Sequence, residues 1–216
     1  MLQLHHTPST AAMVPHILLE EIGVPYERVP VDRANGAHKS PAYLRLNPNG
    51  LIPVLVDGDL VLYETAAIAL HLCDRHPTAE LAPAIGTTER AHFYKWMAWL
   101  TNTLQATLIV YFYPERWVDA GNAEGMAQVR RHAHERVVGL LGQLEEQLRS
   151  HAGLWFFGER YTALDAYVFT LCRWTRNFPS GKARELPRLG PYLLRVLERP
   201  AVQRVLANEQ LQPPFV

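Results

Sequence analysis

The spacing of apolar residues changes once along this chain, near residue 87, and no other feature limits the fold as much. Before it, short strand-like runs alternate with short helical segments, which is the βαβ pattern of a mixed sheet. After it, apolar residues recur about every 3.6 positions and strand-like runs almost vanish, which predicts long amphipathic helices. The sequence therefore predicts an α/β N-terminal domain at residues 1–76 and an all-α C-terminal domain at residues 87–216.

The segment at residues 77–86 separates the two patterns. It contains Pro77, Pro83 and Gly86, and such residues interrupt helices and strands alike, so we predict a linker there. A long helix should end near Pro114. The remaining periodic segments predict strands at residues 2–5, 26–30 and 54–56, and helices at residues 12–21, 41–46, 66–72, 123–151, 191–197 and 202–208.

The segment at residues 47–65 reads as a hairpin that leads into a helix. Pro53 opens its first strand, and proline is tolerated at the first residue of a strand or on a sheet edge. We expect an edge here, with the N–H and C=O of Ile52 free to pair with an extended peptide ligand. Asp57-Gly58 predicts a type I′ turn between the two strands.

The helix after this hairpin starts at Glu64-Thr65. The first amides of a helix have no partner within it and lie at the positive end of its dipole. Such a helix start suits a carboxylate ligand. The alternative is a plain hairpin and helix that bind nothing, because turn signals of this kind are common.

The charge balance limits the partners of the protein. Lys plus Arg and Asp plus Glu each number 21, so the formal net charge is zero. This argues against electrostatic capture of nucleic acid or of an anionic membrane. The chain shows no apolar run of the roughly 18 residues that a membrane span needs. Its start, Leu2-Gln3-Leu4, lacks a basic and apolar leader, so we expect a cytoplasmic protein with small-molecule or protein partners.

Neither cysteine nor histidine predicts a metal or disulfide site. Cys73 and Cys172 each lie within an apolar helical pattern, which favours buried thiols over a disulfide. The histidine pairs lack the spacing and third ligand that zinc enzymes show, so we expect no metal. The pairs considered are His5-His6, His71/His76 and His132/His134.

Thr162-Ala163-Leu164-Asp165 is a helix-start motif in the C-terminal part. In this pattern the first side chain bonds an amide of the helix while the acidic side chain reaches back to the N-cap. It marks the start of a buried helix that runs to Arg173 and Trp174. We assign it to folding and not to chemistry, since replacing an N-cap with alanine typically costs about 1 kcal/mol.

Taken together, these features resemble a cytosolic glutathione transferase along nearly the whole chain. They are the βαβ…ββα unit, Pro53, Glu64-Thr65, the linker, the helical half and the Thr162…Asp165 motif. Residues 162–167 with Arg173-Trp174, and residues 198–203, are most similar to the bacterial beta type. The resemblance implies a thioredoxin-like domain with a mixed four-stranded sheet, an all-helical domain, a cis Ile52–Pro53 bond, a homodimer and a role in detoxification.

The reactive position departs from the beta type. Where those enzymes carry cysteine this chain has Ala11, followed by Ala12, and neither side chain can bond or attack a sulfur. Ser9 falls where the theta and zeta classes place a thiol-activating serine, and Thr10 follows it as the second candidate. The alternative for this pair is capping of the next helix.

The resemblance also implies contacts for glutathione as co-substrate. Glu64 resembles the residue that holds the γ-glutamyl amino group, and Thr65 the one that holds its carboxylate. His38 aligns with a theta-class residue near the glycyl carboxylate, although a histidine in a polar loop needs no ligand. Residues 49–51 lack the lysine or glutamine that relatives often offer there, so weaker or rearranged binding is expected.

The second-substrate pocket is the least defined part. Gln105 stands where beta-type relatives carry histidine, and Trp174 matches their tryptophan. With the aromatic end at residues 111–113, which begins with Tyr111, both are candidates to line the pocket. Ordinary core or dimer packing is the alternative for these aromatic side chains.

Three functions follow from this pattern. The first is conjugation of the glutathione thiolate to a small hydrophobic electrophile. The second is a thiol–disulfide or peroxide reduction that uses the sulfur of glutathione, since residues 9–12 include no cysteine. The third is a binding or regulatory protein that keeps the fold without the chemistry, which Ala11, Ala12 and Leu51 favour. The fold alone does not separate them, because function resides in the site.

Overall fold

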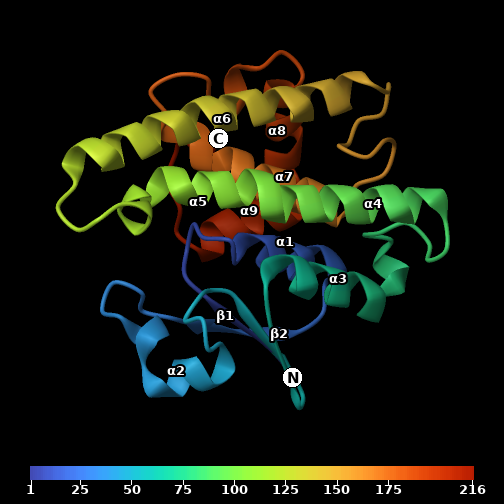
Figure 1. Cartoon of the computed structure of the whole chain (residues 1–216). Helices are drawn as coiled ribbons and strands as arrows, with labels where there is room; N and C mark the ends of the chain where they lie inside the picture. The colour runs from blue at the N-terminus through green and yellow to red at the C-terminus, as the bar shows by residue number, and fades with distance from the viewer.

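The computed structural model describes residues 1–216, and its two halves correspond to the two sequence patterns (Figure 1). The N-terminal half holds a four-stranded sheet in the order β2-β1-β3-β4, and the C-terminal half is helical. This is the thioredoxin-like α/β arrangement followed by an all-α domain that the sequence predicts. The strands are β1 (Leu2–His6), β2 (Tyr26–Pro30), β3 (Val54–Asp57) and β4 (Leu60–Tyr63).

The helices follow the predicted segments closely. Those of the N-terminal half are α1 (Met13–Ile22), α2 (Pro41–Leu46) and α3 (Thr65–Arg75). Those of the C-terminal half are α4 (Thr88–Trp99), α5 (Ala106–Phe112), α6 (Ala123–Arg149), α7 (Ala163–Arg173), α8 (Leu189–Leu197) and α9 (Pro200–Asn208). None of the helices combines the length and the apolarity that crossing a bilayer requires.

Short segments of other helix types connect these elements. A π-helical segment, η3 (Leu100–Gln105), joins α4 to α5, so the long helix expected to end near Pro114 consists of three consecutive pieces. Such π segments occur frequently at functional sites. The 3-10 segments are η1 (Ala37–Lys39), η2 (Pro77–Ala79), η4 (Pro114–Trp117), η5 (Trp174–Asn177) and η6 (Ala183–Glu185).

The strand that follows Pro53 is not a sheet edge, contrary to the expectation. β3 lies between β1 and β4 and pairs antiparallel with both. Pro53 immediately precedes β3 at the end of the ladder, where its missing N–H leaves no strand partner unpaired. The N–H and C=O of Ile52 lie beyond the ladder and form no hydrogen bond with other backbone groups. The Ile52–Pro53 peptide bond is cis, as the resemblance implies.

The turn between β3 and β4 also differs from the expectation. The strand register pairs Asp57 with Leu60, so the central turn residues are Gly58 and Asp59. Gly58 has φ 61°, whereas neither Asp57 nor Asp59 has a positive φ. A glycine of positive φ at the first central position is the pattern of a type II′ turn, and the predicted type I′ is therefore wrong.

Helix α1 connects the sheet with the helical half. Helices α1 and α3 lie between the sheet and the helical half, and α2 lies on the opposite side of the sheet (Figure 1). Every residue from Met13 to Leu19 is buried, and α1 contacts both α7 and α9. The loop that leads into α1 therefore lies at the junction of the two halves. Both cysteines, Cys73 and Cys172, are buried free thiols as predicted.

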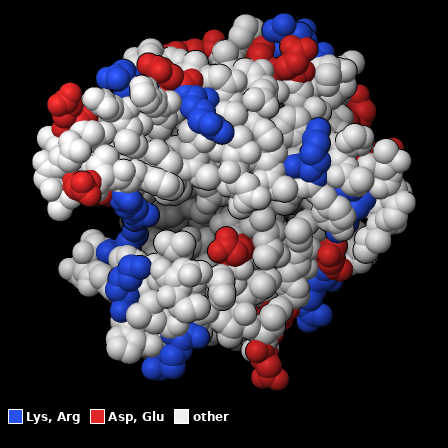
Figure 2. Space-filling model, viewed as in Figure 1, with Lys and Arg blue, Asp and Glu red and all other residues white.

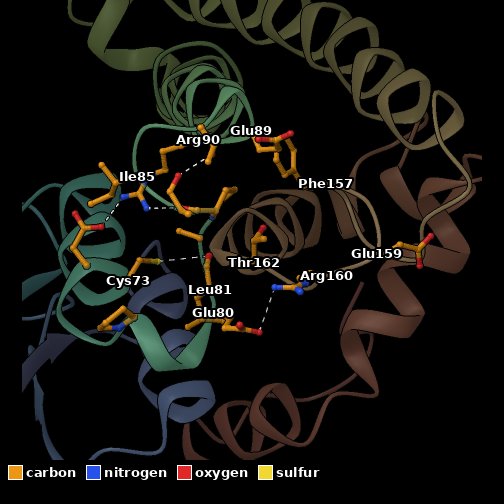
Figure 3. A pocket seen from close by; sticks show the side chains of 16 residues that line it. Cys73, Glu80, Leu81, Ile85, Glu89, Arg90, Phe157, Glu159, Arg160 and Thr162 are labelled. Carbon is orange, nitrogen blue, oxygen red and sulfur yellow. Dashed lines mark hydrogen bonds and ion pairs between the residues drawn. The ribbon is translucent and has the colours of Figure 1, made fainter.

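Arg90 ties the segment between α3 and α4 to both helices. Its side chain is buried, and its guanidinium donates to Asp74 Oδ1 at 2.6 Å and to the carbonyl of Pro83 at 2.9 Å. A cavity of about 640 Å³ lies beside this residue (Figure 3). We keep residues 77–86 as the proposed boundary between the domains.

The predicted helix start at Thr162 is a hydrogen-bonded centre of the helical half. The fully buried carboxylate of Asp165 accepts from the N–H of Thr162 at 2.7 Å, as the motif predicts. It also accepts from the N–H of Phe156 and the hydroxyl of Tyr192, both at 2.8 Å. Burial nevertheless raises the pKa of Asp165 to about 6. This group thus holds the start of α7 against its neighbours.

Candidate functional site

A cavity of about 410 Å³ opens between the two halves of the molecule. It is visible as a hollow with Lys and Arg side chains beside it (Figure 2). Its volume falls within the range of roughly 300–1,000 Å³ of small-molecule sites. Of the candidate site residues from the sequence, those that line it are Ser9, Thr10, His38, Ile52, Gln105, Phe112, Tyr113 and Trp174.

Ser9 adopts a backbone conformation that a serine rarely takes. Its φ is 62°, and the left-handed region costs a non-glycine residue about 1–2 kcal/mol. The Ser9 N–H donates to Glu209 Oε2 at 2.8 Å, which helps to hold this conformation. Helix α1 begins only at Met13, and its N-cap residue is Ala12. The alternative reading of Ser9 as a helix cap is therefore wrong.

Arg173 holds the hydroxyl of Ser9. Its Nη1 donates to Ser9 Oγ at 2.6 Å. Because a guanidinium has no acceptor, Ser9 Oγ is the acceptor in this bond, and the serine proton stays available for another group. Burial and the charge of Arg176 lower the pKa of Arg173 to about 10. Arg173 thus remains charged at neutral pH, directly behind a serine that faces the cavity.

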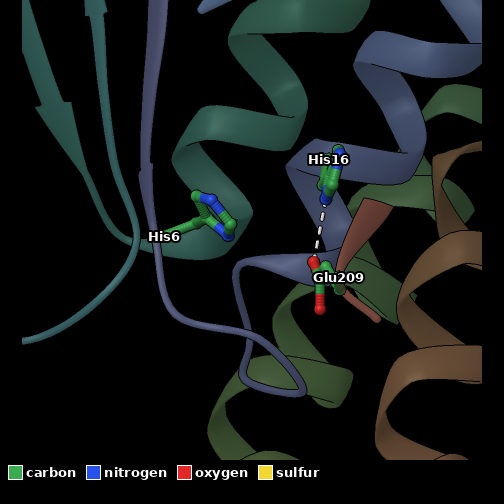
Figure 4. Close-up of side chains that lie close together, drawn as sticks. All are labelled: His6, His16 and Glu209. Atoms are coloured by element: carbon green, nitrogen blue, oxygen red, sulfur yellow. Dashed lines mark hydrogen bonds and ion pairs between the residues drawn. The ribbon is translucent and has the colours of Figure 1, made fainter. Parts of the chain in front are cut away.

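Glu209 holds the Ser9 loop by accepting from the Ser9 N–H, and it also bonds His16 of α1 (Figure 4). Its Oε1 lies 2.8 Å from His16 Nδ1, and both side chains are completely buried. The ligand atoms of His6, His16 and Glu209 lie within 4.8 Å of one another, close enough to hold a metal ion. The carboxylate already bonds His16 and the Ser9 N–H. We assign Glu209 to positioning of the Ser9 loop.

Thr10 is less well placed than Ser9 to donate into the cavity. Its Oγ1 donates to the carbonyl of Thr7 at 2.7 Å and accepts from the N–H of Ala12 at 3.3 Å. The hydroxyl proton of Thr10 is therefore already used within the loop. Between the two hydroxyls, only that of Ser9 keeps a free proton.

Glu64 and Thr65 lie at the start of α3 and not in the wall of the cavity. Glu64 is exposed and has φ 72°, which makes it, like Ser9, one of the four non-glycine residues with positive φ. Non-glycine residues in such conformations cluster at functional sites. The pKa of Tyr167 is raised mainly by burial and, to a smaller extent, by the negative charge of Glu64. The hydroxyl of Tyr167 donates to Gln105 Oε1, and Gln105 lines the cavity.

The η1 turn supplies His38 and Lys39 to the cavity wall. Burial, followed by the charges of Lys39 and Arg33, lowers the pKa of His38. His38 is therefore neutral at pH 7. Lys39 Nζ donates to the carbonyl of Asn49 at 3.2 Å. The sequence prediction did not include Lys39, although it directly follows a residue that was included.

The aromatic end of α5 contributes only part of what the sequence predicts. Phe112 and Tyr113 line the cavity beside Trp174. Tyr111 does not line it, and its assignment to the second-substrate pocket is withdrawn. Its ring packs against Phe178, with a centroid separation of 4.4 Å. Successive residues of a helix point about 100° apart, which turns Tyr111 toward Phe178.

The site residues that the sequence prediction missed are basic or acidic side chains from distant segments. Arg173 and Glu209 lie 164 and 200 positions from Ser9. The available signal for Arg173 was a charge in the otherwise apolar run of α7, since buried arginines are rare. Glu209 sits in an unremarkable polar segment and gave no such signal. Arg173 and Glu209 do not line the cavity themselves, whereas three further basic residues do: Arg33, Arg116 and Arg176.

Comparisons with known proteins agree with the fold. Residues 2–74 match the family model of the glutathione S-transferase N-terminal domain, and residues 127–199 match that of its C-terminal domain. Glutathione S-transferase 3 of Zea mays is 33% identical over 203 residues, which cover 91% of this chain and 89% of that protein.

Two solved structures share the whole architecture. A glutathione transferase homolog from Sulfitobacter, with bound glutathione, has a TM-score of 0.88 and 25% identity, covering 98% of this chain and 99% of that one. A beta-class glutathione S-transferase of Sphingomonas chungbukensis has a TM-score of 0.82 and 28% identity, covering 97% and 100%. With both domains matched in order along one chain, the protein belongs to the glutathione S-transferase family.

Proposed function

We propose that this protein is a glutathione transferase in which Ser9 activates the thiol of glutathione for attack on a small hydrophobic electrophile. The observation that carries this proposal is the bond from Arg173 to Ser9 Oγ, at 2.6 Å. It leaves the serine hydroxyl as a donor that faces the cavity, with a fixed positive charge behind it. Both features favour an anion at the sulfur position.

The cavity and its borders offer a place for each part of the tripeptide. The free N–H and C=O of Ile52 suit the peptide backbone of the ligand, in the manner of an added strand. Glu64 and Thr65, at the start of α3, suit the amino and carboxylate groups of the γ-glutamyl end. His38 and Lys39 suit the glycyl carboxylate, Lys39 through its charge and His38 through a ring nitrogen that donates.

The chemistry is thiol ionisation followed by substitution or addition. A free thiol has a pKa near 8.5 and is mostly protonated at neutral pH. Hydrogen bonding to the sulfur and the nearby Arg173 charge both favour the thiolate and lower that pKa. The thiol proton leaves to solvent. The sulfur electron pair then forms the bond to the electrophilic carbon; in a substitution the leaving group departs with its electron pair, and in an addition the π bond breaks and its electron pair takes a proton from solvent. Ser9 donates a hydrogen bond and does not itself attack.

Two measurements test the proposal. Isothermal titration calorimetry should show glutathione binding, and an assay with a chlorodinitrobenzene should show thioether formation. The Ser9→Ala variant should keep binding and lose turnover by about 10²-fold, a typical effect of losing one charge-stabilising donor. Thr10→Ala is the matched comparison and should change turnover much less. Full activity in Ser9→Ala would overturn the assignment of Ser9.

The second candidate function, reduction of a disulfide or peroxide, would have to proceed without a reactive protein thiol. No cysteine lines the cavity, and Ala11 takes the place of the beta-type residue. Burial raises the pKa of both protein thiols, that of Cys73 to about 12. A disulfide or peroxide reductase would therefore use the glutathione sulfur. Turnover of a disulfide or hydroperoxide, with none of the chlorodinitrobenzene, would favour that function. Binding without any turnover would favour a non-catalytic protein.

The beta-type subclass and the homodimer also belong to this proposal. The likeness to the beta-class structure from Sphingomonas chungbukensis supports the subclass. For the dimer, β4 is an edge strand on which Leu60 and Val61 are about two-fifths exposed. An exposed apolar edge of this kind is unusual unless it is covered. Sedimentation equilibrium should give twice the mass of one chain.

A further inference from the structure

Four basic side chains in the wall of the cavity lack acidic partners. Its wall includes Arg33, Lys39, Arg116 and Arg176, and no Asp or Glu. None of these four takes part in an ion pair, which would require a carboxylate oxygen within 4.0 Å. In a chain with no net charge, this is a local excess of positive charge.

The contacts of these side chains are with neutral groups. Arg33 Nη2 donates to the hydroxyl of Tyr113 at 2.7 Å, and the Arg116 guanidinium lies 4.2 Å from the centroid of the same ring. Arg176 Nη1 donates to the carbonyl of Arg173 at 2.9 Å. Aromatic rings and carbonyls orient the guanidinium groups but do not cancel their charge. The positive potential in the cavity therefore persists until an anionic ligand binds.

Glutathione accounts for only part of this charge. In the proposed function its glycyl carboxylate lies at Lys39, on the side of the N-terminal half, and its γ-glutamyl end lies at Glu64. Arg116 and Arg176 come from η4 and η5 of the helical half. Phe112 and Trp174 also line the cavity from the helical half, and this is the part that remains for the second substrate.

We propose that the second substrate is an aromatic electrophile that carries an anionic group such as a carboxylate. The ring packs against Phe112 and Trp174, and the anion binds Arg116 and Arg176. This inference rests on the proposed function and names its substrate class. Guanidinium groups suit a carboxylate because their paired N–H donors match its two oxygens.

The reaction with such a substrate leaves the anion unchanged. For a halogenated arene carboxylate, the glutathione sulfur forms a bond to the ring carbon that bears the halogen. The carbon–halogen bond breaks, and the halide leaves with its electron pair. The carboxylate serves only for recognition, so it should affect KM more than kcat.

A matched pair of substrates tests the inference. A chlorodinitrobenzene and the chlorodinitrobenzoate that carries one added carboxylate are compared at saturating glutathione. With the Arg116→Gln/Arg176→Gln double variant, kcat/KM for the benzoate should fall by at least about tenfold relative to that for the neutral compound, the effect of losing one charge-assisted contact. Added salt should also lower the ratio of kcat/KM for the benzoate to kcat/KM for the neutral compound in the wild type, because salt screens the charges. Arg131→Gln, on the exposed face of α6, is the control and should change neither rate.

The result that would overturn the inference is an equal change for both substrates, which would make the arginines general supports of glutathione or of the fold. If the wild type turns over neither compound, the proposed function fails and the inference is tested by calorimetry instead. The two thioether products, with and without the carboxylate, are then titrated into the wild type and the double variant. The inference predicts that the wild type binds the carboxylate product about tenfold more tightly than the neutral product and that the double variant loses this difference. Equal binding of the two products by the wild type refutes it.

Discussion

Arg173 donates a hydrogen bond of 2.6 Å to the hydroxyl of Ser9, across the junction of the two halves of the molecule. Ser9 belongs to the loop between β1 and α1, and Arg173 is the last residue of α7. The donor function of the serine thus depends on the helical half, because without the guanidinium the hydroxyl has no fixed direction. The site is complete only when both halves are packed together.

Two replacements of Arg173 should separate the effect of its charge on the glutathione thiol from the effect of its fixed N–H direction. In Arg173→Met, the thiol of bound glutathione loses a nearby positive charge, and its pKa should rise by about one unit, or 1.4 kcal/mol. Arg173→Lys should show a smaller rise because it keeps the charge and loses the fixed N–H direction. The pH profile of kcat/KM for conjugation reports this pKa. A folded Met variant with the profile of the wild type would contradict the role of Arg173.

Replacing Glu209 should loosen the Ser9 loop. In Glu209→Gln both buried bonds, to Ser9 N–H and to His16 Nδ1, lose the carboxylate charge that strengthens them. We expect a loss of about 1–3 kcal/mol in the free energy of unfolding, measured in urea. The conjugation rate should fall as well, with glutathione affinity changed much less. Glu198→Gln, at an exposed position of the same segment, is the control and should show neither effect.

The positive φ of Ser9 predicts different stabilities for two small substitutions. Glycine adopts φ 62° without strain, whereas alanine keeps the strain of serine. Both substitutions remove the Ser9 hydroxyl that accepts from Arg173. Ser9→Gly should therefore be more stable than Ser9→Ala by about 1 kcal/mol in thermal or urea unfolding. Equal stability, or a more stable alanine variant, would show that this backbone is not strained.

Much of this architecture could be predicted because its signals are local. The hairpin before α3 and the helix start at Thr162 follow from residues within about one turn or strand of each other. The position of β3 in the sheet does not follow from nearby residues. A sheet edge and an inner strand can share the same local pattern, and strand order depends on pairing with β1, 50 residues away.

The same distinction between local signals and distant contacts applies to the site. Ser9 and Glu64 were found through resemblance, while their left-handed backbone came from packing that no local pattern records. Arg173 and Glu209 reach Ser9 through contacts between distant segments. A π segment before α5 changes the phase of the helix, and Phe112 and Tyr113, not Tyr111, line the cavity. A periodic pattern that assumes 3.6 residues per turn does not anticipate such a shift.

The buried carboxylate of Asp165 predicts a pH dependence of stability. Its pKa in the folded protein is about 6, above the ordinary 3.8. Between these values the folded state binds more protons than the unfolded state, so this group contributes less stability as pH rises. The difference in unfolding free energy between wild type and Asp165→Asn should therefore fall from pH 4 to pH 7. A difference that grows over this range would show that the hydrogen bonds to the carboxylate outweigh its burial.

The most direct test of the central claim is an ultraviolet absorbance titration of the thiolate of glutathione bound to the wild type and to Ser9→Ala. If the Ser9 hydroxyl stabilises the thiolate, the midpoint in the wild-type complex lies below the ordinary value of about 8.5 and rises by about one unit or more in the variant. The same midpoint in both complexes, with glutathione bound in each, would contradict the claim.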